Sequence, residues 1–226
     1  MAITLTDLIP KSKPFPPVSF QKDDTVLLLI DMQRLATGEH ILHGAIEKGF
    51  DETEAREALK AYDEELNAAV RQAALLLDAF RRLGMTAIHV KIESRSNDAR
   101  ETSFAHRLSG FLVPKGSYWG QWIPETAPKE GEIVITKTCS GAVTGSDLDT
   151  VLRNLRTKNV LVTGFHLNQC VETTVRNLAD LGYLTFVVSD AVSASTPKHY
   201  TNTMENILGV YARAITAAEA IKEIEK

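Results

Sequence analysis

Apolar runs alternate with stretches of helical character along most of the chain. The runs are rich in Val, Ile and Leu with few polar interruptions, which is typical of strands buried on both faces of a parallel sheet. The pattern predicts six strands, at residues 25–31, 85–93, 132–137, 159–164, 183–190 and 211–216.

The segments between these runs predict the helices. The longest should begin after Asp51 or Thr53, which are both good N-caps, and should end before Gly84, as one helix or as two end to end. The others are expected at residues 146–157, 169–180, 197–208 and 217–225. Strands that alternate with helices indicate an α/β protein, here a three-layer α/β/α fold with a six-stranded, mostly parallel Rossmann-like sheet. The connections 32–60 and 94–130 have the least defined pattern.

The first 22 residues are expected to form an extended arm, because their prolines are incompatible with a helix. The prolines of this segment are Pro10, Pro14, Pro16 and Pro17. Beyond the arm, a length of 226 residues and a hydrophobic content of 44% suit one large domain. We therefore expect residues 1–226 to form a single domain that carries an N-terminal arm.

Charge and cysteine content exclude several classes of protein. The net charge is −4 and no long run of one sign occurs, so nucleic acid is not an expected partner. Two cysteines cannot build a disulfide framework, which favours a reducing compartment. No signal-peptide pattern opens the chain, and no apolar run reaches the roughly 20 residues of a membrane span. The expectation is a cytoplasmic protein that acts on a small molecule without membrane contact.

Three chemically useful side chains fall at the ends of predicted strands. Asp31 follows the first strand, Lys137 ends the third, and Cys170 comes shortly after the fourth. Each alone has an ordinary explanation: a turn carboxylate, a solvated lysine and a small core residue. Ligands of open parallel sheets bind outside the carboxyl ends of the strands, so the three can converge there. Their joint placement favours an activated nucleophile.

The chemistry of that trio is that of a cysteine nucleophile. The thiolate is the attacking species, and a free thiol is mostly protonated at neutral pH. Cys170 is expected at a helix N-terminus, where the helix dipole and the Lys137 ammonium would favour the thiolate. Asp31 could accept the thiol proton, and backbone N–H groups before Cys170 could bind an oxyanion.

Three segments resemble the isochorismatase-like cysteine hydrolases, the superfamily of nicotinamidase, N-carbamoylsarcosine amidase, and biuret and ureidoacrylate hydrolases. They are LLLIDMQ at 27–33, ITKTCSGAVTGSDLDTVLR at 135–153 and VLVTGFHLNQCVETTVRNLADLGY at 160–183. The resemblance runs from about residue 24 to residue 216. It implies a catalytic triad of Asp31, Lys137 and Cys170.

The resemblance also predicts the geometry of the turn before the cysteine. It implies a cis peptide bond between Phe165 and His166, and an oxyanion hole made by the N–H groups of His166 and Cys170. His166 and Leu167 replace the small residue and the threonine of the usual family turn. The floor of the pocket should therefore differ from that of other members.

No metal and no cofactor are expected. The Asp-x-His metal motif of nicotinamidases is absent from KIESRSND at 91–98, where the resemblance would place it. His40 and His43 could form a metal pair only with a third ligand, which the sequence does not supply nearby. A carrier-protein segment of the kind fused to some isochorismatases is not expected.

Several further residues are candidates for the pocket. The substrate-binding candidates are Gln33, Leu167 and the aromatic residues Tyr118, Trp119 and Trp122. The aromatic residues suit a subunit interface equally well, and both roles hold if a neighbouring chain closes the site. We expect a homo-oligomer, a dimer or a tetramer. His89 is expected in the core or behind the site, His106 at the surface, and Cys139 in packing.

The retained cysteine favours the amide-hydrolysing branch of the superfamily. The prediction is a cysteine-dependent hydrolase that cleaves a C–N bond of a small amide, ureide or carbamoyl compound through a thioester. Three alternatives stay open: vinyl-ether hydrolysis of an isochorismate-like substrate, thiol redox chemistry of Cys170 with Cys139, and a non-catalytic protein of the same fold.

Overall fold

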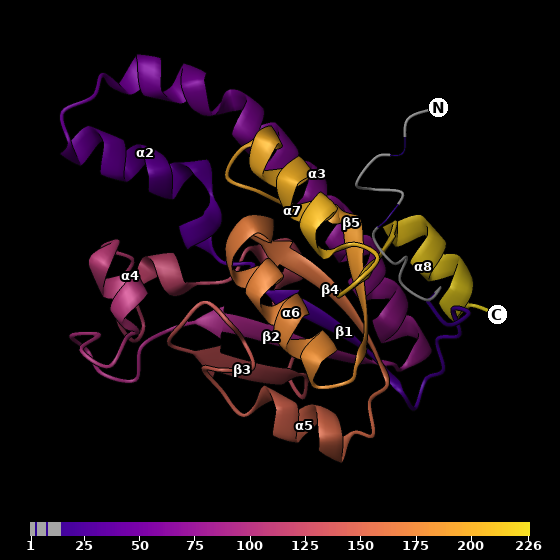
Figure 1. Ribbon diagram of the computed structural model, residues 1–226. Coiled ribbons are helices and arrows are strands. Elements are labelled where there is room, and N and C mark those ends of the chain that lie inside the picture. Colours follow the sequence, from indigo (N-terminus) through magenta and orange to yellow (C-terminus); the bar gives the residue numbers. More distant parts are fainter. Residues whose placement is uncertain (1–2, 4–7, 9–14) are drawn as a thin grey trace.

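The computed structural model describes residues 3, 8 and 15–226, and its described part contains one six-stranded sheet (Figure 1). The strands are β1 (Thr25–Ile30), β2 (Thr86–Ile92), β3 (Ile133–Lys137), β4 (Asn159–Phe165), β5 (Leu184–Ser193) and β6 (Arg213–Ile215). Their order is β3-β2-β1-β4-β5-β6, and every neighbouring pair is parallel. The predicted α/β fold is confirmed, with an all-parallel sheet in place of a mostly parallel one.

Helices cover both faces of the sheet. They are α2 (Gly38–Glu47), α3 (Glu52–Leu83), α4 (Phe104–Leu108), α5 (Leu148–Asn154), α6 (Glu172–Asp180), α7 (Pro197–Ile207) and α8 (Ala217–Ile224). In Figure 1, α5 and α6 lie in front of the sheet and α3 runs behind it, where α3 packs against α8. No helix in the described part of the chain is long and apolar enough to cross a membrane.

The long helix α3 has the ends that its sequence predicts. The Asp51 side chain accepts a hydrogen bond from the Glu54 N–H at 3.0 Å, and Gly84 ends the helix in a left-handed conformation. The preceding helix α2 was not predicted. It is short, carries two glycines, and packs along α3, where Asp63 accepts a hydrogen bond from the Gly38 N–H at 2.9 Å. Tertiary packing, more than local propensity, stabilises it.

The proline arm is only partly described. Pro10 and Pro14 lie outside the described residues, and residues 15–21 form neither helix nor strand. Phe20, near the end of this segment, is buried, and its ring packs edge-on against Phe186 of β5 with 4.9 Å between the ring centroids. This aromatic contact holds the end of the segment on the sheet.

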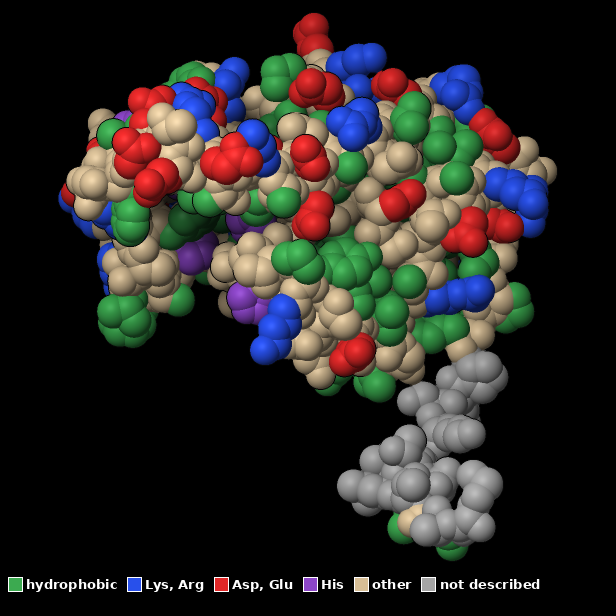
Figure 2. Space-filling view, turned by 90° about the horizontal axis from the view of Figure 1, so that it is seen from above, with side chains coloured by type: hydrophobic (Ala, Val, Ile, Leu, Met, Phe, Trp, Pro, Cys, Tyr) green, Lys and Arg blue, Asp and Glu red, His purple; other side chains and the backbone are tan. Residues whose placement is uncertain are grey.

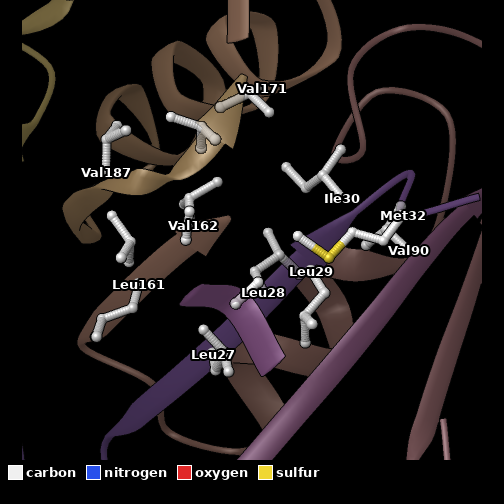
Figure 3. Packing of buried hydrophobic residues seen from close by; sticks show 14 of the residues in the cluster. Leu27, Leu28, Leu29, Ile30, Met32, Val90, Leu161, Val162, Val171 and Val187 are labelled. Carbon is white, nitrogen blue, oxygen red and sulfur yellow. The ribbon is translucent and has the colours of Figure 1, made fainter. Parts of the chain in front are cut away.

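The central strands form the core. All six residues of β1 are buried, and the side chains of Leu27 to Ile30 pack among residues of β2, β4 and β5 (Figure 3). Helices cover both faces, so every position of the strand faces apolar neighbours, and the strand has no polar alternation. The continuous apolar run in the sequence follows from this double coverage.

The strand order places the topological switch point of the sheet between β1 and β4. The chain leaves β1 toward β2 and β3 on one side and returns to β4 on the other, so the connections diverge at the carboxyl ends of these neighbouring strands. Gly164, paired with Ile30, has φ 116°, and a Cβ atom there would lie 1.9 Å from the Ile30 carbonyl oxygen. Only glycine permits this close approach, which brings the residues after the two strands together.

Candidate active site

Asp31 leaves β1 in a conformation that aspartate seldom adopts. Its φ is 51°, its N–H donates to the Val90 carbonyl at 2.9 Å, and its own carbonyl accepts from the Gln33 N–H at 2.8 Å. The residue is 1% exposed. Left-handed backbone at a non-glycine residue is energetically unfavourable and concentrates at functional sites. These backbone bonds fix the main chain of Asp31 at the carboxyl end of β1.

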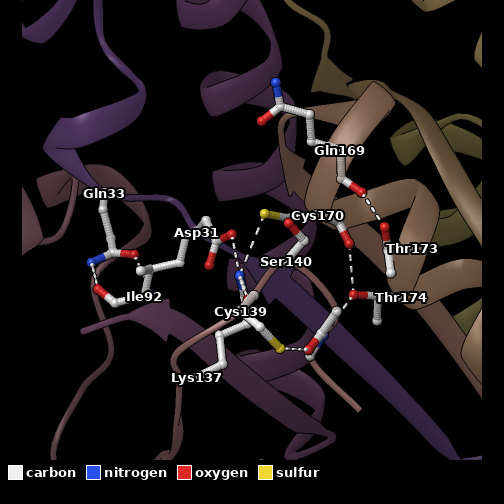
Figure 4. A network of polar contacts seen from close by, with 12 residues as sticks. Asp31, Gln33, Ile92, Lys137, Cys139, Ser140, Gln169, Cys170, Thr173 and Thr174 are labelled. Carbon is white, nitrogen blue, oxygen red and sulfur yellow. Dashed lines mark hydrogen bonds and ion pairs between the residues drawn. The ribbon is translucent and has the colours of Figure 1, made fainter. Parts of the chain in front are cut away.

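Lys137 brings a buried ammonium to the same point. It is the last residue of β3, its side chain is fully buried, and its Nζ lies 2.8 Å from Oδ2 of Asp31 and 3.4 Å from Sγ of Cys170. Nζ also donates to the Cys139 carbonyl at 3.0 Å. Figure 4 shows these contacts converging on one nitrogen. The three strand-end residues therefore lie together, joined through Lys137.

Cys170 lies in a π-helical turn. The sequence pattern predicted it at the N-terminus of an α-helix, and this prediction is wrong. The turn spans Leu167–Val171, and α6 begins only at Glu172. Within it, the His166 carbonyl accepts from the N–H groups of Gln169 at 3.0 Å and Val171 at 3.3 Å. π-helical turns are frequent at functional sites because they redirect a side chain.

Burial governs the protonation of this cluster. It raises the pKa of Cys170 to about 12, and the Asp31 charge adds to the rise while Lys137 opposes it. Burial also raises the pKa of Asp31, which Lys137 partly offsets. Burial disfavours the charge on Lys137, but attraction to Asp31 and Cys170 outweighs it, so the pKa of Lys137 is raised. At neutral pH, Cys170 is a thiol beside a permanently charged ammonium.

The peptide bond between Phe165 and His166 is cis, at the position that the family resemblance predicts. The described contacts give the His166 N–H no hydrogen-bond acceptor. Phe165 and Leu167 are buried in the core, and contact of Leu167 with a substrate stays a prediction. Only the His166 side chain of these three is part-exposed.

Thr174 supports the cysteine, a role that the sequence analysis missed. Its hydroxyl donates to the Cys170 carbonyl at 2.7 Å and accepts from the Ala142 N–H at 3.0 Å (Figure 4). It thereby joins the segment after β3 to the helix that follows Cys170. The only sequence signal is its position four residues after Cys170, one helical turn away.

Gln33 has a structural role that differs from the substrate contact expected for it. Its amide nitrogen donates to the carbonyls of Ile92 at 3.0 Å and Gly120 at 2.8 Å, and its amide oxygen accepts from the Ile92 N–H at 2.8 Å. Both amide hydrogens are used and the side chain is fully buried. Gln33 ties β2 and the 94–130 connection to the end of β1.

The three aromatic candidates lie in different places. Tyr118 is exposed and its hydroxyl accepts from Arg34 at 2.7 Å. Trp119 packs against His40 of α2, with 4.8 Å between the ring centroids. Trp122 packs against His89 of β2 at 5.9 Å. None of the three aromatic residues lines the cavity beside α2, whereas His40 does. Contact of the three aromatic residues with a substrate stays a prediction.

His106 belongs to the surroundings of the site, although the sequence placed it at the surface. It is buried on α4, and its Nε2 lies 3.2 Å from the Ser140 hydroxyl, three residues beyond Lys137. Burial and the nearby Lys137 charge lower the pKa of His106, so it is neutral. The pair anchors the 94–130 connection beside the triad.

Cys139 is not oriented toward the second cysteine. Its Sγ contacts the Gly141 carbonyl at 3.4 Å and points away from Cys170 (Figure 4). A side-chain packing role fits this geometry. His89 lies behind the site, fully buried, with its Nε2 3.0 Å from Glu132.

A cavity of about 530 Å³ opens between α2, the turn after α4 and the turn that carries Cys170. We call it the chamber; its lining includes Leu35, Ile41, Phe50, Phe111, His166 and Gln169. A hollow with histidine side chains at its edge is visible in the space-filling view of Figure 2. His166 and Gln169 precede Cys170 in the turn that carries it, so the chamber reaches this turn, although its lining does not include Cys170, Asp31 or Lys137.

The described residues contain no group of three or more His, Cys, Asp or Glu side chains arranged to hold a metal ion. His40 and His43 both pack against Trp119 instead. The expectation that the protein needs no metal or cofactor stays a prediction.

Comparison with known proteins decides the family. The isochorismatase domain, as a family model, matches residues 25–219. The chain belongs to the isochorismatase family. The resemblance drawn from the three sequence segments is thereby confirmed.

Relatives within the isochorismatase family include two proteins named ureidoacrylate amidohydrolase. The one from Stutzerimonas stutzeri is 27% identical over 190 residues, which cover 80% of this chain and 75% of the relative. The one from Variovorax paradoxus is 28% identical over 183 residues, which cover 77% of this chain and 71% of the relative.

Solved structures share the fold. A cysteine hydrolase from Pseudomonas syringae pv. phaseolicola aligns with a TM-score of 0.76 at 21% identity, over 95% of this chain and 98% of that one. N-carbamoylsarcosine amidase from Thermoplasma acidophilum aligns with a TM-score of 0.65 at 23% identity, over 87% of this chain and 98% of that one. At these identities the likeness shows the fold alone.

Proposed function

We propose that this member of the isochorismatase family is an amidohydrolase that cleaves a C–N bond of a small ureide, carbamoyl or amide compound, with Cys170 as nucleophile. The observation that carries the proposal is the contact of one buried ammonium with both Asp31 and Cys170. The family and the amidohydrolase names of its relatives support the reaction class.

The first half of the reaction forms a thioester. Asp31 takes the proton of the Cys170 thiol, and Sγ attacks the substrate carbonyl carbon. The negative charge moves to the carbonyl oxygen, where the free N–H of His166 and the N–H of Cys170 form the oxyanion hole. The C–N bond then breaks, and the leaving nitrogen takes the proton from Asp31.

The second half releases the acid. A water molecule gives a proton to Asp31 and attacks the thioester carbon. The C–S bond breaks as the second tetrahedral intermediate collapses, and Asp31 returns the proton to Sγ. The balance is one amide and one water converted to one acid and one amine. Asp31 suits this shuttle because burial raises its pKa and makes its carboxylate a stronger base.

Lys137 stabilises the negative charge on whichever partner carries it. Its Nζ lies 2.8 Å from Asp31 and 3.4 Å from Cys170. The negative charge therefore stays in contact with the ammonium whether it is on the Asp31 carboxylate or on the Cys170 thiolate. The raised pKa of Lys137 keeps it protonated throughout. A proton transfer that only relocates one negative charge beside a fixed cation has a lower barrier than one that creates a separated pair.

The wider setting is part of the proposal. We infer a single domain, a cytoplasmic location and a homo-oligomer of two or four chains. Redox chemistry is less favoured, because Sγ of Cys139 contacts the Gly141 carbonyl and points away from Cys170.

The test is ammonia or amine release from a panel of small amides, ureides and carbamoyl compounds. Wild type should turn over at least one class, Cys170→Ser and Cys170→Ala should fall below about 1% of that rate, and Cys139→Ser should stay active. Near-UV circular dichroism checks that the variants are folded. Retained amine release in Cys170→Ala would overturn the role of Cys170 as nucleophile, whereas vinyl-ether chemistry led by Asp31 would give no amine release in any of these proteins.

A second measurement identifies the nucleophile directly. Mass spectrometry of the enzyme quenched with a slow substrate should find an acyl adduct on the Cys170 peptide. An adduct on Cys139 would overturn the assignment.

A further inference from the structure

The His166 side chain is held by a chain of two hydrogen bonds that reaches across the fold. Its Nε2 lies 2.7 Å from the Tyr62 hydroxyl in α3, and the same hydroxyl donates to the Ala36 carbonyl. Tyr62 and His166 are 104 residues apart in the sequence. The two hydrogen bonds hold the imidazole ring of His166 at the wall of the chamber, in the turn that carries Cys170.

These two hydrogen bonds also fix the tautomer of the His166 ring. A tyrosine hydroxyl has one proton, and a carbonyl oxygen can only accept. Tyr62 therefore gives its proton to Ala36, and the other contact requires His166 to donate from Nε2. Burial raises the pKa of Tyr62 and lowers the pKa of His166 to about 4, so both groups are neutral at pH 7. The second ring nitrogen, Nδ1, is left with a lone pair and no proton.

That lone pair is open to a ligand. Nδ1 of His166 has no hydrogen-bond partner among the described residues, and it is not one of their buried unsatisfied polar atoms, so it is accessible. His166 lines the chamber, and Cys170 lies four residues further along the same turn. An accessible acceptor of fixed orientation in the turn that carries the proposed nucleophile is suited to a donor group on the substrate.

The remaining polar groups of the chamber do not favour a negatively charged substrate at this point. His40 is neutral because burial lowers its pKa. The charged lining residues, Glu47 and Lys48, are exposed at the end of α2 and have opposite signs. The rest of the lining is apolar or uncharged, including Leu35, Phe111 and Gln169. A carboxylate beside Nδ1 would face a lone pair, and the one lysine of the lining, Lys48, lies at the exposed end of α2.

We propose that His166 determines substrate specificity, and that its Nδ1 accepts a hydrogen bond from an N–H group of an uncharged amide or ureide bound in the chamber. This inference rests on the proposed function, because it names the substrate class of the same site. It separates two substrate types: compounds with an N–H beside the reacting carbonyl bind well, and N,N-dialkylated compounds do not. Tyr62 is a positioning residue, since it acts only through His166.

The experiment compares a primary amide with its N,N-dimethyl counterpart in four proteins. Wild type, His166→Asn, His166→Phe and Tyr62→Phe are assayed for kcat/KM on both compounds, with the most active acyl group of the panel. Asparagine keeps an acceptor oxygen near the place of Nδ1, whereas phenylalanine keeps only the ring. Comparing the ratio of the two kcat/KM values between a variant and wild type cancels the intrinsic difference in reactivity of the two substrates.

We expect the preference for the primary amide to fall about tenfold or more in His166→Phe, mainly through KM, as is typical when a buried polar partner is lost. His166→Asn should keep most of the preference, and Tyr62→Phe should lose part of it because the ring is no longer held. If His166→Phe proves unfolded, Tyr62→Phe decides the question, because it also is expected to lose preference, whereas His166→Asn is expected to keep it. An unchanged ratio in folded His166→Phe, or in Tyr62→Phe if His166→Phe does not fold, overturns the proposal.

A binding measurement separates this inference from the catalytic one. In a Cys170→Ala background, calorimetry should find tighter binding of the primary amide than of the dimethyl amide, and the difference should disappear when His166→Phe is added. If wild type turns over neither compound but this binding difference is found, the proposed function fails and the role of His166 stands. If wild type is active and the two amides bind equally well, His166 does not contribute to substrate specificity.

Discussion

At the residue scale, the candidate site combines a protonated thiol with a buried ion pair. The sequence alone favoured a thiolate stabilised at a helix N-terminus. In the structure, burial raises the pKa of Cys170 to about 12, and the π-helical turn holds it apart from the start of α6. In the proposed mechanism Asp31 therefore acts as the base each time a substrate arrives, and Lys137, 2.8 Å from it, stabilises the negative charge. A resting thiol of this kind is protected from adventitious oxidation.

We predict that Lys137→Met raises the pKa of Cys170 above that of wild type. Lys137 lowers this pKa against the larger effects of burial and Asp31, and a cation within about 4–6 Å commonly shifts an acid by one to three units. The measurement is the rate of iodoacetamide labelling of the Cys170 peptide against pH. Labelling should be slow near neutral pH in wild type, rise only at alkaline pH, and be slower still in Lys137→Met at every pH.

Lys137→Arg tests the shape of the cation separately from its charge. It keeps the charge, but a planar guanidinium cannot occupy the place of a compact ammonium that contacts Asp31, Cys170 and the Cys139 carbonyl. Turnover should be impaired, though less than in Lys137→Met. Identical labelling profiles for wild type and Lys137→Met would remove Lys137 from the site.

At the scale of elements, the site depends on how closely β1 and β4 approach each other. Gly164 pairs with Ile30, and the residues that follow the two strands supply Asp31 on one side and the Cys170 turn on the other. The 94–130 connection is held beside them by Gln33 and by the pair of His106 and Ser140. Rigid strands thus set the position of the reacting groups, and the connections close around them.

We predict that Gly164→Ala destabilises the fold by about 3 kcal/mol or more and abolishes activity. Its Cβ would lie 1.9 Å from a backbone oxygen, at a φ of 116° that other residues rarely adopt. Gly44→Ala is the control, because a Cβ there meets nothing within 4 Å and the residue lies inside helix α2. The control should be as stable as wild type or gain up to about 1 kcal/mol. Urea unfolding measures both, and equal midpoints for the two variants would refute the close-approach argument.

At the scale of the whole molecule, two features bear on assembly and on cofactors. The α4 region exposes large apolar side chains, with Phe104 72% and Leu108 77% exposed. Apolar side chains gathered on a surface commonly mark an interface. The second feature is that the proposed mechanism generates the nucleophile with Asp31 and Lys137, without a metal-bound water.

We predict that the protein is a dimer or tetramer in solution and that Leu108→Asp shifts it toward the monomer. A charge introduced at an apolar interface has no partner there and opposes association. Light scattering gives the mass, and Val210→Asp, at a residue 64% exposed in the connection after α7, is the control that should not change it. A monomeric wild type would contradict the prediction.

We also predict that activity does not require a metal ion. Dialysis against a strong chelator should leave the turnover rate unchanged, since the described residues contain no cluster suited to hold a metal. Loss of activity that is restored by adding a divalent metal would be the opposite result.

The sequence by itself determined the sheet, the ends of α3 and the convergence of three strand-end residues. These depend on local signals: unbroken apolar runs for strands covered on both faces, Asp51 and Gly84 at the helix ends, and the rule that parallel strands present their carboxyl ends at one edge. It also indicated the cis bond before His166, through family resemblance.

Tertiary structure alone decided the contacts between residues far apart in the chain. Tyr62 reaches His166 across 104 positions, and Gln33 bonds to backbone 59 and 87 positions away. Such contacts leave no periodic or capping pattern, because they depend on where whole elements pack. The same reason explains why the protonation of Cys170 could not be predicted: its pKa is set first by burial, which exists only in the folded chain.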